Sequence, residues 1–212
     1  GAATNTDIGY LIGQSTTTYN NYYGLNLINC KYANLNVTSK YASGGFAGYV
    51  DSGSNALVSS VKNTKDQELV IGDNSTITAN TNTSYAGGVF GYVKTNVRIN
   101  DPEDATRYKK VIINNVSVKA TNQAGGYIGQ IADFNNNGFK IYNAVYQNQK
   151  VEAGNNAGGL IGNSESKTSN VISQCIIDKV TLNTANNGTK QEGGLIGRLG
   201  NSGSVNVSSS TV

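Results

Sequence analysis

The sequence predicts an all-β protein, a parallel β-helix (β-solenoid) of about six coils, with one coil for each repeat of 33–43 residues. Three observations lead to this prediction. A Gly-Gly-apolar-apolar-Gly unit recurs along the chain, runs of alternating apolar residues precede it, and no segment carries an apolar stripe of helical period. The repeats extend over the whole chain, so residues 1–212 form one predicted domain.

The glycine unit is the strongest signal. A partial copy occupies Gly9–Gly13, and successive copies start 35, 43, 38, 33 and 35 residues apart. Such self-similarity is the mark of stacked repeats, in which one unit buries its apolar face only against its neighbours. The structural glycines of the five complete copies are Gly44, Gly45, Gly48, Gly87, Gly88, Gly91, Gly125, Gly126, Gly129, Gly158, Gly159, Gly162, Gly193, Gly194 and Gly197.

Glycine suits this place for two reasons. It tolerates positive φ, and it lets neighbouring backbones approach closely. Stacking would align the glycine pairs as a column of tight corners beside a column of buried apolar residues. We interpret one repeat as one coil, since two coils within about 35 residues would leave little chain for turns.

The segments between the glycine units supply the other strands. Val37, Val118 and Val151 each lie seven residues before a first glycine, within runs of alternating apolar residues. Such alternation is typical of a strand with one buried face. Asn, Ser, Gly and Thr, which favour turns, separate the strands.

The composition excludes several classes of protein. Charged residues make up only 14% of the chain and the net charge is +3, too weak for a nucleic-acid binder. No apolar run approaches 18 residues, so no membrane span is expected. The absence of His excludes His-containing zinc sites, haem ligation by His and His-assisted nucleophiles. The absence of Met suggests a processed or excised segment.

The stretch 158–162, Gly-Gly-Leu-Ile-Gly, and the stretch 170–175 that follows it resemble the GLUG motif. This motif occurs in tandem in large bacterial surface proteins, including adhesins and the non-catalytic part of some IgA-cleaving proteases. The resemblance implies a right-handed β-helix, a cell-surface location and an adhesive or spacer role, with no catalytic residue. Family members often carry Tyr or Asn after the last glycine. Tyr49, Tyr92 and Asn163 fit that pattern, and Gln14, Gln130 and Arg198 depart from it.

Tyrosine supplies the candidate ligand contacts. Thirteen tyrosines stand beside only four phenylalanines. Tyr41 and Tyr85 precede glycine pairs, so equivalent tyrosines of neighbouring coils could stack into a ladder that suits sugars or protein partners. The alternative is the ordinary preference of tyrosine for strands. The predicted ligand contacts are Tyr22, Tyr23, Tyr49 and Tyr92.

The loops offer one weak metal candidate. Asp133, Asn135 and Asn137 match the first half of a calcium-binding loop, but Ala144 stands where such a loop has Glu. We therefore expect no cofactor beyond weak calcium binding, and a plain turn is the favoured interpretation. The longest unit has its extra length within 51–82. The mixed-charge stretch 100–110 contains the only Pro and could begin a short helical turn at Pro102.

We expect no enzyme. Ser59 with Lys62, and Ser164 with Lys167, fit an S-x-x-K spacing, but they lie in strand or turn context without partner motifs. No acids stack at one position of successive repeats, as polysaccharide hydrolases and lyases would require. Cys30 and Cys175 are expected to be too far apart for a disulfide and to remain buried free thiols.

Neither end of the sequence resembles a cap, and uncapped coils expose strand edges. The sequence thus predicts part of a longer surface protein, or a subunit that polymerises. The most favoured function is an extracellular bacterial adhesin or adhesive stalk that binds a host glycan or protein. The alternative is a filament subunit that joins identical subunits end to end, and a polysaccharide-active enzyme is less favoured.

Overall fold

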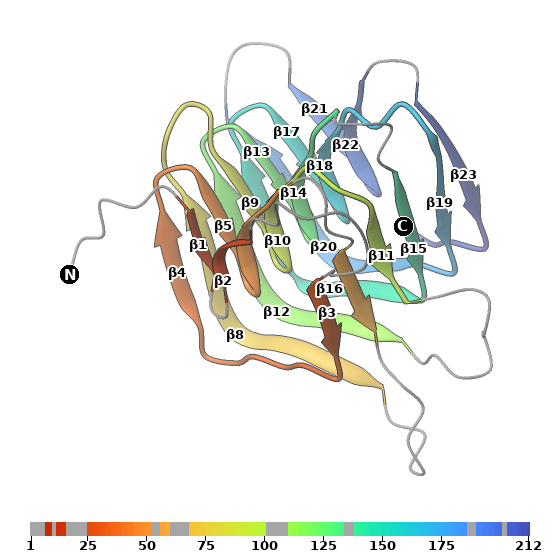
Figure 1. Cartoon of the computed structure of the whole chain (residues 1–212), viewed down its shortest axis with the longest axis horizontal. Helices are drawn as coiled ribbons and strands as arrows, with labels where there is room; N and C mark the ends of the chain where they lie inside the picture. Colours follow the sequence, from red (N-terminus) through yellow and green to blue (C-terminus); the bar gives the residue numbers. More distant parts are fainter. Residues whose placement is uncertain are drawn as a thin grey trace.

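The structure is a computed structural model, and it describes residues 7–9, 12–15, 25–51, 56–59, 68–100, 110–133, 138–185, 190–200 and 203–212. Within these ranges every regular element is a β-strand. The strands pair in parallel and stack in four sheets along the molecule (Figure 1). The predicted all-β class is thus confirmed, and the arrangement is consistent with a parallel β-helix or solenoid.

Two sheets flank the glycine units, and we name the sheets A to D. Sheet A contains β1 (Asp7–Gly9), β5 (Ala42–Gly44), β9 (Tyr85–Gly87), β13 (Gln123–Gly125), β17 (Asn156–Gly158) and β21 (Gln191–Gly193). Sheet B contains β2 (Ile12–Ser15), β6 (Ala47–Val50), β10 (Phe90–Val93), β14 (Ile128–Ile131), β18 (Ile161–Ser164) and β22 (Ile196–Leu199).

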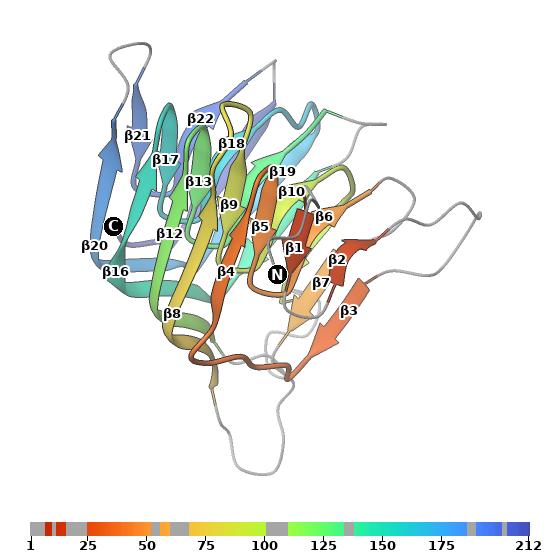
Figure 2. The ribbon, with the colours of Figure 1, turned by 90° about the vertical axis from the view of Figure 1, so that its left-hand side faces the viewer.

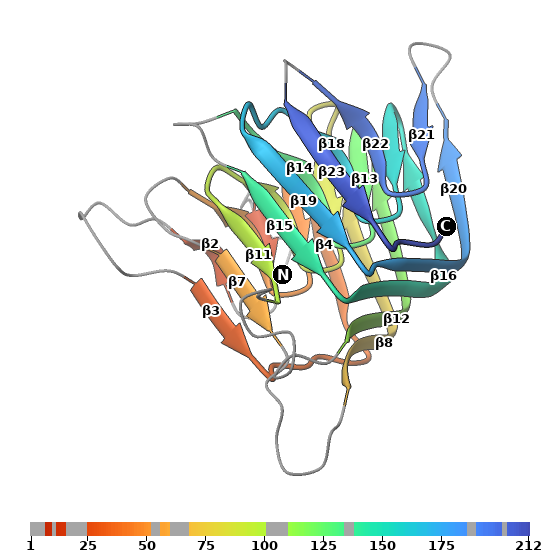
Figure 3. The same cartoon turned by 90° about the vertical axis from the view of Figure 1, so that its right-hand side faces the viewer.

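The other two sheets complete the circuit. The strands of sheet C lie next to one another in Figure 3, and those of sheet D lie next to one another in Figure 2. Sheet C contains β3 (Leu25–Ile28), β7 (Ala56–Ser59), β11 (Val97–Ile99), β15 (Phe139–Tyr142), β19 (Ser169–Ser173) and β23 (Ser204–Ser208). Sheet D contains β4 (Asn36–Ser39), β8 (Leu69–Ala79), β12 (Val111–Ala120), β16 (Ala144–Ala153) and β20 (Ile176–Thr184). The strands that one repeat supplies to the four sheets are called a rung below.

The pairing register follows the repeat. In sheet A, the last residue of each strand is a first glycine, and Gly44 pairs with Gly87, which pairs in turn with Gly125. Gly125 then pairs with Gly158. Each strand therefore lies beside the equivalent strand of the next repeat. The repeats differ in length, from 33 to 43 residues, only in the segments away from the glycine corners.

The corner glycines serve close approach. A Cβ on Gly126 would overlap the carbonyl oxygen of Gly159 on the next rung and the ring of Tyr146. A Cβ on Gly88 would likewise overlap the carbonyl oxygen of Gly126, to which the Gly88 amide donates a hydrogen bond of 3.1 Å. Positive φ, the other expected reason for glycine, does not apply, because Gly72 is the only glycine of the described residues with φ in that range.

The core runs along the stack as columns of like residues. In sheet B, Phe90, Ile128 and Ile161 are register partners and are fully buried. Val97, Phe139 and the neighbouring isoleucines of sheet C continue this core on another side. Each apolar side chain is thus covered mainly by its counterparts one rung away, as expected for a stacked repeat.

Asparagine forms a second kind of corner. Positive φ occurs at Asn29, Asn100 and Asn143, between sheets C and D, and again at Asn115 and Asn148 inside the long strands of sheet D. Asparagine adopts this left-handed conformation more readily than most residues with a side chain. Asn34 and Asn74 adopt the same conformation, so asparagine is the commonest residue with positive φ among the described residues.

Several predictions fall outside the described residues. The stretch around Pro102 lies there, as do 52–55 and 60–67 of the long second unit. Both cysteines are free thiols, as expected; Cys175 is fully buried, whereas Cys30 is only partly buried. No helix in the described part of the chain is long and apolar enough to cross a membrane.

Candidate functional site

A single row of sheet B holds the residues that follow the last glycine of each of the five complete units. Its members pair in register from rung to rung, so they lie along the stack at intervals of about 4.8 Å. The side chains change from aromatic to amide to cationic along the row. We call this set the sheet B row: Tyr49, Tyr92, Gln130, Asn163 and Arg198.

Four tyrosines meet at one end of the row. Tyr49 and Tyr92 stack with ring centroids 5.1 Å apart and planes 17° apart. Tyr85, from sheet A, lies 4.9 Å from Tyr92, and Tyr41 lies 5.2 Å from Tyr85 in an edge-to-face contact. Tyr41 also lies 5.8 Å from Tyr92. We call these four residues the tyrosine cluster, and the structure brings them together from two successive repeats.

The ring stack limits what the cluster can offer. One face of Tyr49 is covered by Tyr92, and the ammonium of Lys94 lies 5.6 Å from the Tyr49 ring centroid. Aromatic and cation–π contacts of this kind occupy the ring faces that a sugar would otherwise stack on. The half-buried cluster therefore presents hydroxyl groups and ring edges more than free ring faces.

Burial favours the neutral form of three of the hydroxyl groups, those of Tyr41, Tyr85 and Tyr92. Burial raises the pKa of Tyr92 to about 12, and it also raises the pKa of Tyr41 and of Tyr85. The side chains of Tyr41 and Tyr85 are hydrogen-bonded to each other. A hydrogen bond with Tyr49 raises the pKa of Lys94. The cluster thus combines neutral phenols, which donate and accept hydrogen bonds, with one cation.

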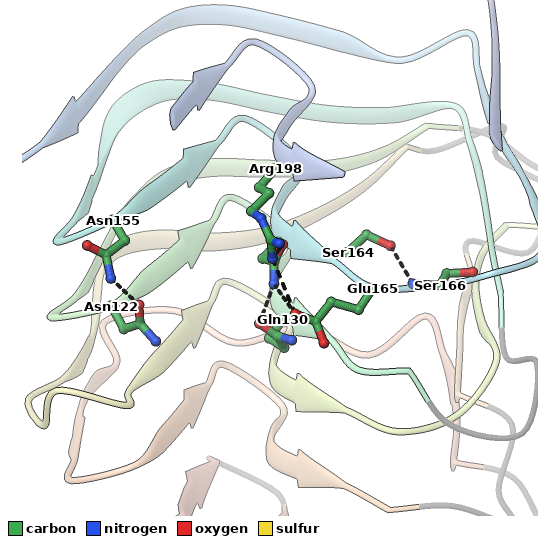
Figure 4. Close-up of polar contacts among 8 residues, drawn as sticks. Asn122, Gln130, Asn155, Ser164, Glu165, Ser166 and Arg198 are labelled. Atoms are coloured by element: carbon green, nitrogen blue, oxygen red, sulfur yellow. Dashed lines mark hydrogen bonds and ion pairs between the residues drawn. The ribbon is translucent and has the colours of Figure 1, made fainter. Parts of the chain in front are cut away.

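The other end of the row is an amide and ion-pair network (Figure 4). Asn163 Nδ2 donates a 2.9 Å hydrogen bond to Gln130 Oε1. Arg198 Nη1 lies 3.3 Å from Glu165 Oε1 and donates a 3.4 Å hydrogen bond to Asn163 Oδ1. The negative charge of Glu165 also contributes to the raised pKa of Tyr92, so the two ends of the row are electrostatically coupled.

Exposure differs along the row. Gln130 and Asn163 are buried, whereas the side chains of Arg198 and Glu165 are 36% and 32% exposed. The accessible groups are therefore the tyrosine cluster and the ion pair, and the two amides connect them below the surface. A similar amide contact of 2.6 Å joins Asn155 to Asn122 on neighbouring rungs (Figure 4).

The predicted ligand contacts thus have different outcomes. Tyr49 and Tyr92 lie in the cluster, and Tyr22 and Tyr23 lie outside the described residues. The sequence placed Gln130 and Arg198 at the position that follows the last glycine, but it gave no indication of their contacts with Asn163. The matching position in successive repeats was the signal that could have revealed the row.

The calcium candidate is described only in part. Asn135 and Asn137 lie outside the described residues, and the Asp133 carboxylate forms an ion pair with the Lys167 ammonium. The described residues contain no group of three or more His, Cys, Asp or Glu side chains that could hold a metal ion. Calcium binding at Asp133 stays a prediction.

The described residues include Ser164 and Lys167 of one S-x-x-K match but only Ser59 of the other. Ser164 is fully buried, and its Oγ accepts a 3.3 Å hydrogen bond from the Ser166 amide (Figure 4). The ammonium of Lys167 contacts Asp133, as noted above. Lys62 of the other match lies outside the described residues.

Comparison with known proteins gives no further indication. A scan against models of protein families, a search of curated proteins and a search of solved structures each found no match.

Proposed function

We propose that this chain is an extracellular, cell-surface module of a bacterial adhesin or adhesive stalk, built as a right-handed β-helix of six coils with one coil per repeat. The GLUG-like glycine units support the surface location. The pairing of each strand with its counterpart one repeat away supports one coil per repeat. The proposal includes no catalytic step.

The observation that carries the proposed binding role is the tyrosine cluster. Four partly buried tyrosines from two repeats converge on a scaffold of paired strands, with Lys94 at one side. Clustered phenols supply both apolar contact and hydrogen bonds, which is the chemistry that recognises sugars and protein surfaces. We infer that a host glycan or a host protein contacts the cluster through its hydroxyl groups and ring edges.

A binding screen tests this function. The chain would be screened against a glycan array and a set of host matrix proteins, and each saturable ligand would be titrated. Tyr41→Ala with Tyr49→Ala should weaken binding at least tenfold, because both rings contribute contact area to the cluster. Tyr142→Ala, a half-buried tyrosine of sheet C, is the matched control and should leave affinity unchanged. Failure to bind any ligand, or equal binding by the cluster variant, would contradict the proposal.

A second function, end-to-end assembly with identical subunits, is favoured by one observation. Leu199 and Val207 are 43% and 53% exposed, although their register partners Ser164 and Ile172 are fully buried. A rung of a second copy would cover them. Sedimentation at rising concentration should then give an open-ended size series that Leu199→Lys abolishes. Val70→Lys, at an exposed apolar residue of sheet D, should leave that series intact. A single species at all concentrations would exclude assembly.

A further inference from the structure

Tyrosine is the most abundant oxidisable side chain in this protein. The chain contains 13 tyrosines but no tryptophan, methionine or histidine, and only two cysteines. Cys175 is fully buried and Cys30 is partly buried. An oxidant that removes one electron at a time therefore has few targets other than tyrosine. Since tyrosyl radicals that lie in contact combine with each other, the arrangement of the rings decides which products form.

The described tyrosines of the core are closed to such an oxidant. Tyr127 and Tyr146 are fully buried, and Tyr32 is only 6% exposed. The hydroxyl group of Tyr146 donates a 2.6 Å hydrogen bond to the carbonyl oxygen of Val116, and that of Tyr127 donates a 3.0 Å hydrogen bond to the carbonyl oxygen of Val145. These two hydroxyl groups are thus held by the backbone inside the stack.

The tyrosine cluster differs from the core tyrosines, because all four of its side chains are partly exposed. Ring contacts connect every member to at least one other, with centroid separations of 4.9 to 5.8 Å. An unpaired electron on one ring can therefore pass to the next ring without crossing intervening protein. Oxidation of any exposed member would thus supply radicals to the whole cluster.

One pair of the cluster is placed for a covalent bond. Tyr49 of β6 and Tyr92 of β10 are register partners on adjacent parallel strands (Figure 2). Their rings stack with centroids 5.1 Å apart and planes 17° apart. The unpaired electron of a tyrosyl radical occupies the π system, so a new bond forms between ring faces. The stacked pair meets this requirement best, since the planes in the other three contacts are 47° to 87° apart.

The backbone holds the two strands of this pair together. The register pairs on either side of the tyrosines, Ala47 with Phe90 and Val50 with Val93, are fully buried. Close packing on both sides leaves the strands little freedom to slide or to separate. A contact that is already formed gives the reacting groups an effective concentration far above that of separate molecules. Coupling within the pair should therefore be faster than coupling to a second chain.

We propose that Tyr49 and Tyr92 form a site of oxidative modification, at which hydrogen peroxide and a haem peroxidase join the two rings as dityrosine. Each phenol loses one hydrogen atom, and the two hydrogen atoms reduce the peroxide to two molecules of water. A carbon–carbon bond forms between ring carbons ortho to the two hydroxyl groups. The hydrogen atom on each of these carbons then moves to the phenolic oxygen, which restores two aromatic phenols.

The product is a covalent link between two successive rungs. Tyr49 and Tyr92 are 43 residues apart in the sequence, so the link would close a long loop and restrict the unfolded chain. It would therefore stabilise the two rungs in the same way as a disulfide. The reaction uses the tyrosine cluster but no ligand, so it succeeds or fails independently of the proposed adhesive function.

Peptide mapping after oxidation tests the proposal. The full chain, in dilute solution, would be treated with hydrogen peroxide and a haem peroxidase, and the monomer would then be digested with trypsin. Cleavage after lysine leaves the two tyrosines on different peptides, 41–62 and 66–94. The expected product is these two peptides joined, with the loss of two hydrogen atoms and with fragment ions that locate the bond at Tyr49 and Tyr92. Links confined to other tyrosine pairs, or no link in the monomer, would overturn the proposal.

Phenylalanine variants provide the second arm of the test. Tyr92→Phe keeps the ring but removes the hydroxyl group, and it should lower the yield of the joined peptides at least tenfold. Tyr142→Phe, at a half-buried tyrosine of sheet C, is the matched control and should leave that yield unchanged. Both variants retain the aromatic ring, so circular dichroism should show unaltered folding. An unchanged yield in Tyr92→Phe, or an equal loss in Tyr142→Phe, would contradict a specific site.

Discussion

The inner rungs and the last described rung of this molecule carry the same pattern in different surroundings. Ile128 and Ile196 occupy the same column of sheet B, yet Ile128 is fully buried and Ile196 is only partly buried. Val93 and Ile131 are likewise buried, whereas Leu199 is 43% exposed. The difference shows that burial in this fold comes from the neighbouring rung rather than from the residue's own strand.

The largest expected effect concerns the glycine corner. Gly126→Ala should lower the free energy of unfolding by more than about 4 kcal/mol or prevent folding, because the added Cβ meets backbone that has no room to move. Gly194→Ala should cost less than about 1 kcal/mol, because the three atoms nearest to the added Cβ all belong to the side chain of Val212, which is 70% exposed and can move. Denaturant midpoints measure both values. Equal losses of unfolding free energy in the two variants would show that glycine is required by the conformation of the corner itself. They would contradict a requirement set by contact with the next rung.

The column of sheet B that contains Ile128 and Ile196 should give a smaller difference in the free energy of unfolding. Ile128→Ala leaves a cavity between two rungs and should cost about 3 kcal/mol. Ile196→Ala removes a side chain that is covered on fewer sides, so about 1 kcal/mol is expected. The same denaturant titration compares the two variants. A cost at Ile196 as large as that at Ile128 would mean that another rung covers the last one in solution.

The sheet B row should give the smallest difference in the free energy of unfolding between an inner and an outer variant. Asn163→Ala leaves the buried Gln130 Oε1 without its donor and should cost about 2 kcal/mol. Arg198→Gln removes an ion pair whose partners are about one third exposed, so the expected loss is below about 1 kcal/mol and declines with added salt. Thermal unfolding at two salt concentrations checks both expectations. A larger loss for Arg198→Gln than for Asn163→Ala would contradict this ranking.

The sequence was sufficient to predict the stacked strands and the glycine corners. The same close backbone approach recurs in each rung, so glycine recurs at the same position of each repeat. Gly126 and its counterparts in the other repeats are examples. The asparagine corners followed a similar rule that the sequence interpretation did not use, although Asn34, Asn115 and Asn148 each lie ten residues before a first glycine. The spacing of asparagine, like that of glycine, therefore indicates where the backbone turns.

The candidate site was less predictable. A stack of Tyr49 on Tyr92 was one of two interpretations of the sequence, beside ordinary strand preference. The contacts that cover their ring faces involve Lys94 and Tyr85, which the repeat pattern did not indicate. Tyr127 illustrates the same limit, since its hydroxyl lies in the core and donates to the carbonyl oxygen of Val145 at 3.0 Å. Side-chain direction at a tyrosine is decided by contacts between rungs, which a single repeat does not encode.

The strictly parallel register has a consequence for how the chain folds. Each described strand pairs with a strand one repeat away in the sequence, whether it lies near the start or near the end of the stack. The entropy lost on closing the intervening loop is therefore similar at each step, since it grows only slowly with loop length. Once two rungs have paired, growth can proceed as a series of equal additions, so a longer array of such repeats would lengthen the time of folding without raising its barrier.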